Sequence, residues 1–540
     1  MRPINPNGIS FHHPIAFWLG CALIVAGVLS HWPMLAMGAH VHYHLAGMPM
    51  DAPMLIGMAL IPLGVVLAGY GVMPRLELMR RVLQHPRDLA TFRVADSVPL
   101  NAAHWTLVVV LIIALVIDVM KPATLGFVMP GMTAEYAISK KTGGLLAFVA
   151  LIGTTVGSVI WGRIGDLFGR RAAILLSALM FMATAICGAM PSYNWNLAMC
   201  FMMGAAAGGM LPIAFTLMAE TVPAAHRGWL LVALGGIGTS AGYLAAAGAA
   251  TLLEPTFSWR ALWLLNLPTG AVILLLNHWI PESPRFLSSV GLENQARAVL
   301  AKFTGTVPAR DAIEPEAAAP DVGDERQAIT GARQLLHGRY ARVSWGLVLC
   351  GIAWGLVNFG FVLWLPVNLV NLGVDASGTS AILAKSAVLA LPATVVVVSL
   401  YHRWSSFGSL ALFIALTSLA LLVFAALGFA GVHSSAATLA ATVALLISVS
   451  GVIAMLIPYA AEIYPVQLRA TGSGVIAASS KLGGILGAGL GVAGFFEHFV
   501  ASALLIAVPM AISGLMLFRD GIETRGVKLE DIQTAISKAA

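Results

Sequence analysis

Charged residues are scarce in this 540-residue sequence. Only 10% of its residues are Asp, Glu, Lys or Arg and 59% are hydrophobic, whereas a soluble globular domain carries about 25% charged residues. The composition therefore excludes a soluble protein and indicates one that lies mostly within a membrane. The formal net charge is +6, but the basic residues flank apolar runs and form no single basic face. No nucleic-acid partner is expected.

Cysteine is also scarce. The 4 cysteines, Cys21, Cys187, Cys200 and Cys350, lie inside apolar runs and show no paired spacing, so they are expected to be small buried apolar residues. The phosphate-binding loop Gly-x-x-x-x-Gly-Lys-Ser/Thr is absent, which argues against a pump driven directly by ATP. We expect neither an enzyme nor a cofactor.

Long apolar runs dominate what is present. Fourteen stretches near 20 residues, each able to cross about 30 Å of hydrocarbon, extend from 15–37 to 498–518. The first two, 15–37 and 53–73, precede twelve others. We predict an all-α membrane protein with two extra N-terminal helices and a core of two six-helix bundles. The first run is expected to be a retained helix, because only Arg2 precedes it as a basic residue.

The second half of the chain repeats the first at an offset of about 240 residues. Two homologous halves side by side in a bilayer are typical of a carrier that rocks around a central site. The repeated groups are Glu220 and Arg227 with Glu462 and Arg469, at a spacing of 7 in both, and Glu282-Ser283 with Glu523-Thr524.

Basic residues gather in alternate loops, and the positive-inside rule makes that side cytoplasmic. We therefore expect a multi-pass protein of a bacterial-type inner membrane with both termini in the cytoplasm. The opposite loops are poor in Lys and Arg, with Lys140, Lys141 and Arg260 as exceptions. The expected divisions are an N-terminal extension (1–100), a first bundle (101–285), a cytoplasmic linker (286–342), a second bundle (343–520) and a cytoplasmic tail (521–540).

The loop after the second core run reads Gly162-Arg163-Ile164-Gly165-Asp166-Leu167-Phe168-Gly169-Arg170-Arg171. Its glycines permit a tight turn, Asp166 can face a helix N-terminus, and the arginines hold the turn at the anionic cytoplasmic surface. With this loop the chain resembles the major facilitator superfamily, whose hallmark is Gly-x-x-x-Asp-x-x-Gly-Arg-Arg. In the second half Ser405 replaces the Asp and the arginines are missing, so the first loop is expected to dominate the cytoplasmic latch.

Further motifs are similar to the sugar-porter-related branch of that superfamily, among them Pro281 to Arg285 and Glu220 to Gly228. The resemblance implies alternating access without covalent chemistry. The residues it implies for gating are Gly162, Gly165, Asp166, Gly169, Arg170, Arg171, Glu220, Arg227, Glu282, Arg285, Glu462 and Arg469.

The segment Asn358 to Pro366 is more similar to bacterial metabolite and aromatic-acid proton symporters, and to relatives of synaptic vesicle glycoprotein 2, than to true sugar porters. The cargo implied is an organic acid, a nicotinate-like compound or an aromatic carboxylate, and a sugar or polyol is the alternative. The residues expected to bind substrate are Asn358, Trp364, Asn368 and Lys385. The expected partners are this small molecule, protons and the lipid bilayer, with the protein as a monomer.

Two opposite charges stand in the first core run. Asp118 and Lys121 are three residues apart in an otherwise apolar stretch, so they share one face of a helix. A lone charge at this depth is costly, so both are expected to face a partner or a wet cavity. We hypothesise that Asp118 carries the coupling proton and that Lys121 tunes its pKa or meets an anionic substrate. A neutral pair that only fixes helix packing is the alternative. Lys481, in a later run, either contacts an anion or reaches an interface.

Histidine and methionine are concentrated between the two extra helices. His40, His42 and His44 stand at alternate positions among several methionines, and both side chains are ligands for copper, nickel or zinc. A hydrated loop with interfacial methionines explains the pattern as well. A transporter-like sensor or metal-handling protein that uses this loop is therefore the second class of function to consider.

Overall fold

The computed structural model describes residues 13–72, 90–91, 98–289, 292–305, 314–315, 340–371, 376–430, 435–464 and 466–524. Within these residues, 14 helices are long and apolar enough to cross a membrane, which confirms the all-α membrane fold. A helix suits the bilayer because it satisfies its own N–H and C=O groups where no water is present. The strands described, β1 (Ala90–Thr91) and β2 (Glu314–Pro315), form one short antiparallel pair.

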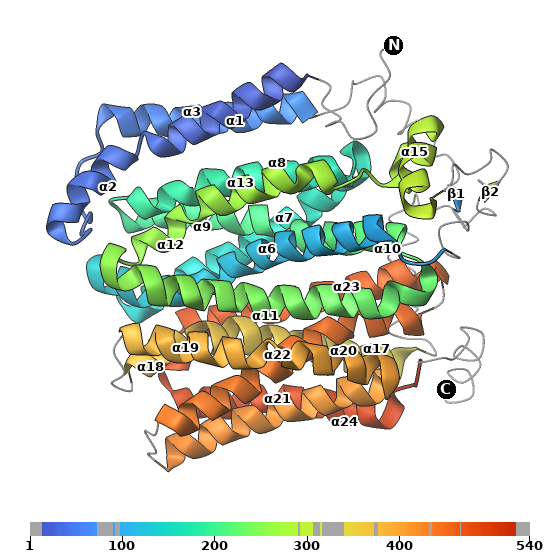
Figure 1. Ribbon diagram of the computed structural model, residues 1–540. Coiled ribbons are helices and arrows are strands. Elements are labelled where there is room, and N and C mark those ends of the chain that lie inside the picture. The colour runs from blue at the N-terminus through green and yellow to red at the C-terminus, as the bar shows by residue number, and fades with distance from the viewer. Residues whose placement is uncertain are drawn as a thin grey trace.

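The two extra helices form a hairpin along one side of the molecule, drawn in blue in Figure 1. Glycines let the two backbones touch: a Cβ on Gly20 would lie 2.6 Å from the Gly64 carbonyl oxygen, and one on Gly64 would lie 2.7 Å from that of Gly20. Small residues allow such close packing where lipid removes the usual hydrophobic drive. The elements are α1 (Pro14–Leu29), α2 (Trp32–Gly38), η1 (Ala39–Val41) and α3 (Ala52–Val72).

The first bundle follows the hairpin, which packs against its helix α8. Helices α7 and α9 approach most closely at glycines: a Cβ on Gly157 would collide with the Ala205 carbonyl, and one on Gly204 with that of Ala150. The elements are α6 (Ala102–Glu135), α7 (Lys140–Phe168), α8 (Arg170–Ala183), η2 (Thr184–Ala189), α9 (Tyr193–Ala207), α10 (Met210–Thr221), α11 (Ala224–Phe257), α12 (Arg260–Leu264), α13 (Asn266–Leu276) and η3 (Asn277–Trp279).

The second bundle begins with a broken helix. A π-helical segment, η5, interrupts it, and Pro366 lies in the α-helical turns that follow. Such π segments are frequent at functional sites, and broken helices line substrate sites in transporters. The elements are α17 (Ala341–Gly355), η5 (Leu356–Val362), α18 (Leu363–Asn371), α19 (Ala376–Ala390), α20 (Ala393–Arg403), α21 (Ser406–Phe429), α22 (Ser435–Ile463), α23 (Val466–Val492), η6 (Phe495–Glu497) and α24 (Phe499–Asp520).

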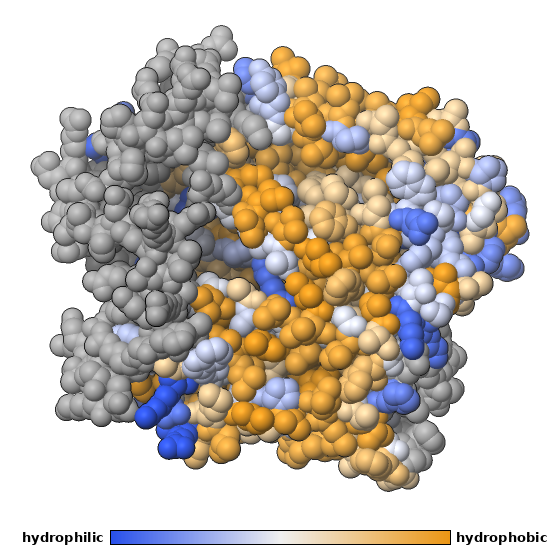
Figure 2. All heavy atoms as spheres, turned by 180° about the vertical axis from the view of Figure 1, so that it is seen from behind, coloured by the Kyte–Doolittle hydropathy of each residue, from blue (hydrophilic) through white to orange (hydrophobic). Residues whose placement is uncertain are grey.

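The two bundles meet along a few helices. Helix α6 packs on α18, α7 packs on α23, and α11 packs on α19, α20 and α22. Figure 1 shows these elements in the middle of the molecule, between the hairpin and the outermost helices α21 and α24. Seen from behind, in Figure 2, the surface of the molecule is broadly apolar. Exposed apolar side chains around the molecule, such as Val66, Leu252 and Phe518, suit contact with lipid. Because α6, α7 and α11 of the first bundle make the contacts with the second, a site between the bundles must be built on these helices and the ones they contact.

The segment after the first bundle contains α14 (Pro284–Ser289) and α15 (Glu293–Thr304). The apolar face of α15 is buried, and Asn101 Nδ2 at the start of α6 donates to the Phe303 carbonyl at 2.7 Å. This contact attaches α15 to the first bundle. The expected divisions at residues 100, 285, 342 and 520 stay predictions of the sequence.

Candidate functional site

The intramembrane charges lie near the middle of their helices, at the junction of the two bundles. Asp118 on α6 is 7% exposed and Lys121 is 1% exposed. The carboxylate of Asp118 is attracted by two amines, Lys121 on its own helix and Lys481 on α23 of the second bundle. The Lys481 amine also donates a hydrogen bond to the Ser158 hydroxyl on α7. An acid of one bundle is thus close to an amine of the other.

The amine of Lys121 lies within the first bundle. Its Nζ is placed against the ring of Phe181 on α8 and has no hydrogen-bond partner among the described residues. This contact places the amine beside α8 of the first bundle. Lys481, for which the sequence left two interpretations, is the amine that the structure brings to the bundle interface.

The four residues that the sequence predicts to bind substrate, three on the broken helix and one on α19, have different surroundings. Asn358 is half-buried in η5. Trp364 stacks on Phe496 with 5.9 Å between ring centroids, and its indole N–H is buried without a partner among the described residues. The side chain of Asn368 lies outside the described residues. Lys385 is exposed on α19, where its long stem suits a position at the membrane interface.

A small cavity lies one helical turn from the charged group. Pro122 stands four residues after Asp118, and Thr154 stands four residues before Ser158. Only about 10 Å³ of the cavity is free space. This cavity is therefore too small for an organic molecule as it stands. The lining residues are Pro122, Leu125, Ala147, Ala150, Leu151, Thr154, Met203, Gly204, Ala207, Phe359 and Leu363.

The repeated glutamates occupy equivalent positions in the two bundles. Glu282 accepts a hydrogen bond from the backbone N–H of Arg170 at 2.7 Å, and Glu523 accepts one from that of Ser406 at 3.0 Å. Each donor is the first residue of the helix that follows the gating loop of its bundle. A carboxylate is stabilised at such a helix N-terminus by the exposed N–H groups and the helix dipole. The internal repeat of the sequence is therefore also a repeat of contacts.

Each bundle has a second glutamate in the same place. We call Glu220 with Glu282 the first cluster, and Glu462 with Glu523 the second cluster. Glu220 accepts a hydrogen bond from the Ser283 hydroxyl, and Glu462 accepts one from the Thr524 hydroxyl at 2.6 Å. In the first cluster Arg170 also forms an ion pair with Glu220 at 3.5 Å, and in the second the Tyr401 hydroxyl also donates to Glu462 at 2.8 Å.

The remaining gating candidates lie around these clusters. Gly169 has φ 101°, a value that favours glycine, and a Cβ there would meet the Glu282 carboxylate. The Arg170 guanidinium donates to the Gly165 carbonyl at 3.1 Å. Arg171 donates to the side chain of Asn277 at 2.7 Å. The side chains of three other gating candidates, Asp166, Arg285 and Arg469, lie outside the described residues.

One further gating candidate, Arg227, lies at the start of α11, next to Gly228. Arg227 donates to the Val222 carbonyl at 3.3 Å. A Cβ on Gly228 would lie 3.2 Å from a Glu462 carboxylate oxygen, so the first bundle contacts the second cluster here. Gly162, in contrast, has open space around it.

Glu282 provides a pH prediction for this cluster. Burial raises the pKa of Glu282 from its usual 4.5 to about 6, against the opposing hydrogen bonds from the N–H groups of Ser283 and Arg170. Because the folded-state pKa is the higher one, this group stabilises the fold below pH 4.5, and the contribution is lost as the pH rises through 6. Relative to Glu282→Gln, the wild type should lose about 1–2 kcal/mol between pH 4.5 and pH 7. Thermal unfolding of the two purified proteins across this range checks it, and parallel curves would contradict it.

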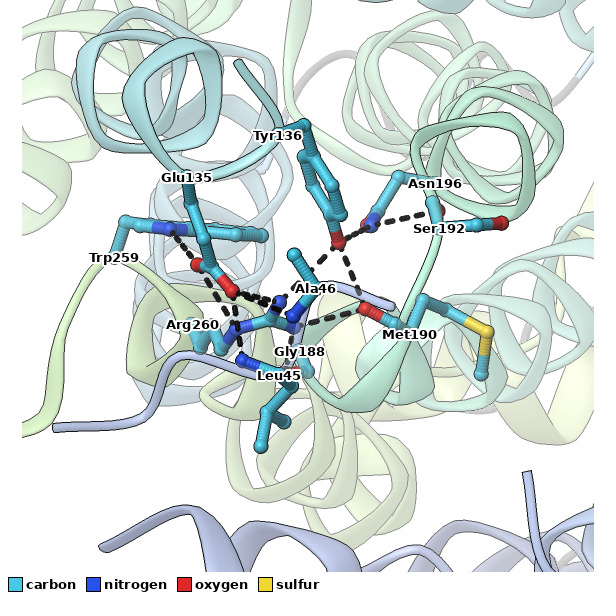
Figure 3. Close-up of polar contacts among 10 residues, drawn as sticks. All are labelled: Leu45, Ala46, Glu135, Tyr136, Gly188, Met190, Ser192, Asn196, Trp259 and Arg260. Carbon is cyan, nitrogen blue, oxygen red and sulfur yellow. Dashed lines mark hydrogen bonds and ion pairs between the residues drawn. The ribbon is translucent and has the colours of Figure 1, made fainter. Parts of the chain in front are cut away.

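At the other end of the first bundle, a carboxylate that forms an ion pair within the bundle also binds the N-terminal extension (Figure 3). Glu135, at the end of α6, pairs with Arg260 of α12 at 2.6 Å. The same carboxylate accepts hydrogen bonds from the backbone N–H groups of Leu45 and Ala46 at 2.8 and 3.1 Å. The Trp259 indole donates to it at 2.9 Å. Arg260, an exception to the charge asymmetry of the loops, is therefore a structural residue that is 0% exposed.

Comparison with known proteins decides the family. Residues 106–488 match the Major Facilitator Superfamily. The chain belongs to this superfamily. The extension and the first turn of α6 precede the matched part.

Individual relatives agree with the superfamily. The niacin transporter NiaP of Acinetobacter baylyi is 28% identical over 450 residues, which cover 81% of this chain and 98% of that protein. The 4-hydroxybenzoate transporter PcaK of Pseudomonas aeruginosa is 27% identical over 436 residues, 78% of this chain and 94% of that protein. Both relatives are transporters, which confirms that this chain is a transporter rather than an enzyme.

Among solved structures, the proton:xylose symporter XylE superposes with a TM-score of 0.62 at 19% identity. The superposition covers 80% of this chain and 99% of XylE. Identity this low establishes the fold alone. It supports the major facilitator arrangement of two six-helix bundles to which this chain adds the hairpin of α1 and α3.

Two patterns in the sequence lack the matching geometry in the structure. Among the described residues, no group of three His, Cys, Asp or Glu could hold a metal ion, although His40, His42 and His44 are all described. The string Gly238 to Gly242 matches the Gly-x-Ser-x-Gly elbow of hydrolases. It lies inside α11 instead of at the strand-to-helix turn which that elbow requires. Neither segment has the geometry of a metal centre or a nucleophile.

Proposed function

We propose that this transporter imports a small organic acid, with an aromatic or heteroaromatic ring, together with a proton across the inner membrane. The observation that carries the proposal is the buried Asp118, which lies at the bundle junction under the influence of Lys121 and Lys481. Intramembrane charges of this kind mark substrate and proton pathways. The names of the relatives, niacin and 4-hydroxybenzoate transporters, indicate the class of cargo.

Proton coupling follows from competition for one amine. While Asp118 is ionised, it attracts the Lys481 ammonium. A proton on Asp118 removes that attraction, and the ammonium becomes available to the carboxylate of an incoming acid. Loss of the proton on the cytoplasmic side restores the attraction and expels the anion. Binding of proton and substrate then favour each other, as linkage requires for symport.

The neighbouring residues have defined roles in this proposal. Lys121, against Phe181, tunes the proton affinity of Asp118. Asn358 and the unpartnered indole N–H of Trp364 donate hydrogen bonds to the substrate, and Asn368 is a further donor on the same helix. Lys385 is left out because its side chain is exposed.

Gating rests on the glutamate clusters. The repeated contacts of Glu220, Glu282, Glu462 and Glu523 join helices within each bundle, so each bundle moves as a unit while the bundles rock. The contact of Gly228 with Glu462 is one that rocking must break. We infer that both termini lie in the cytoplasm, since the spans found among the described residues are even in number and the basic loops mark their side as cytoplasmic. The transporter functions as a monomer.

The test is uptake by proteoliposomes containing the purified full-length protein, with labelled nicotinate, 4-hydroxybenzoate and xylose as probes. We expect an inward proton gradient to drive accumulation of at least one aromatic acid, with protein-free liposomes as the control for passive entry. Accumulation of xylose alone would favour the sugar alternative. Transport of no probe, combined with specific binding, would favour a sensor.

A further inference from the structure

A second and larger cavity lies at the outer end of the first bundle, at the end of α6 and α11. Its volume is about 510 Å³, which is within the usual range for small-molecule sites. The N-terminal extension supplies one wall, and the ends of α6 and α11 supply the other. We call it the outer cavity. Its lining residues are Ala39, His42, Tyr43, His44, Gly131, Ala134, Glu135, Glu254, Pro255, Thr256, Ser258 and Trp259.

The charges of the outer cavity are not balanced. Glu135 is neutralised by its ion pair with Arg260. Glu254 has no cation beside it in the described chain, and its side-chain partner there is the hydroxyl of Ser380, which donates at 3.4 Å. The exposed imidazoles of His42 and His44 stand on the opposite wall. A ligand therefore meets an acid on one side and imidazole N–H donors on the other.

Aromatic side chains complete the walls. Trp259 is held by its hydrogen bond to Glu135 at 2.9 Å. Tyr43 packs edge-on against Phe257, with 6.0 Å between the ring centroids. Tyr43 and Ser258 have φ values of 60° and 61°, a conformation that costs energy in any residue other than glycine and recurs at ligand sites. Both walls thus hold constrained segments. Tyr43 is partly exposed and presents an aromatic surface, whereas Trp259 is only 3% exposed and supports its wall from behind.

We propose that the outer cavity binds a nitrogen-containing aromatic ring, as a capture site for the substrate before it enters the central cleft. The ring nitrogen and the Glu254 carboxyl group share one proton, held either as N–H⁺···O⁻ or as N···H–O. The ring packs against Tyr43, and a carboxylate or carboxamide substituent accepts hydrogen bonds from His42 and His44. The inference rests on the proposed transport of aromatic acids and narrows it to those with a basic ring nitrogen.

Binding in the outer cavity is coupled to the opening of the cleft between the bundles. Its walls belong to the extension and the first bundle only, so it persists when the bundles separate. Glu254, however, accepts its hydrogen bond from Ser380 of the second bundle. A ligand that takes over Glu254 replaces a contact between the bundles at the outer face. Capture therefore favours the outward-open state.

Nicotinamide and benzamide test the proposal, because they differ only by a ring nitrogen in place of C–H. Equilibrium binding is measured on the full-length protein in nanodiscs. The wild type should bind nicotinamide about tenfold more tightly than benzamide, the discrimination expected from one hydrogen bond to a charged group. In Glu254→Leu, which leaves no group to share a proton with the ring nitrogen, the preference should fall below about twofold, whereas Glu254→Asp should retain part of it. Thermal unfolding confirms that each variant is folded.

Two controls separate this site from the central one. Ser380→Ala leaves the outer cavity intact and should retain the ring-nitrogen preference. Lys481→Ala should abolish transport and still retain the preference. Equal binding of the two amides by the wild type, or an unchanged preference in Glu254→Leu, overturns the outer site. If the preference depends on Glu254 but no aromatic acid is transported, the proposed function fails and the outer site stands.

Discussion

In Asp118→Asn, uptake against a gradient should collapse to simple equilibration. One proton carried with one carboxylate is electroneutral, so the pH difference alone sets the limit of accumulation. Two pH units supply about 2.7 kcal/mol per proton, which corresponds to roughly hundredfold accumulation. Asn has nearly the shape of Asp but carries no titratable proton. The inside-to-outside ratio of labelled acid in proteoliposomes should therefore fall from about 100 in the wild type to about 1 in the variant.

Exchange of labelled for unlabelled acid provides the matched measurement. Exchange needs substrate binding and rocking but no net proton movement, so Asp118→Asn should retain it. Asp118→Glu, which keeps a carboxyl group, should restore part of the accumulation. If a correctly folded Asp118→Asn protein still concentrates the acid, the coupling proton is carried elsewhere.

Arg260→Ala should destabilise the outer end of the first bundle by about 3–5 kcal/mol, the usual cost of leaving one member of a buried ion pair alone. The Arg260 and Glu135 side chains are 0% and 7% exposed, and their closest atoms are 2.6 Å apart. Without the guanidinium, the Glu135 carboxylate stays buried with only backbone N–H donors and an indole. Thermal unfolding of the purified protein should show a much lower midpoint than for the wild type.

Two variants control for this effect. Lys141→Ala removes an exposed basic residue of the same outer loops and should change stability by less than about 0.5 kcal/mol. The double variant Glu135→Gln, Arg260→Met removes both charges and should recover much of the lost stability, because no buried charge is left alone. Equal midpoints for Arg260→Ala and Lys141→Ala would show that the pair is not structural.

The membrane fold was predictable because it depends on local properties of the chain. A run of about 20 apolar residues forms a spanning helix whatever its neighbours are, so the 14 spans could be located from composition alone. The repeat of Glu220 and Glu282 in the second half indicated two related bundles, and their contacts with Ser283 and Arg170 recur there. Motif order then indicated the superfamily.

The charged site was only partly predictable. A spacing of three residues places Asp118 and Lys121 on one helix face, but it does not say which neighbour each side chain meets. The position of Phe181 on α8 decides where the Lys121 amine lies. Lys481 reaches Ser158 only because α23 packs on α7. That packing joins residues more than 300 positions apart, which no local pattern records.

The sequence by itself thus determined the class of protein, the number of spans, the two-fold repeat and the superfamily, since each follows from hydrophobicity and short motifs. Tertiary structure alone decided which charges meet between the bundles. It also created the outer cavity, because His42 and Tyr43 of the extension face Glu254 and Trp259 only after the hairpin has docked on the first bundle. Sites between distant segments depend on packing, and packing is a property of the whole folded chain.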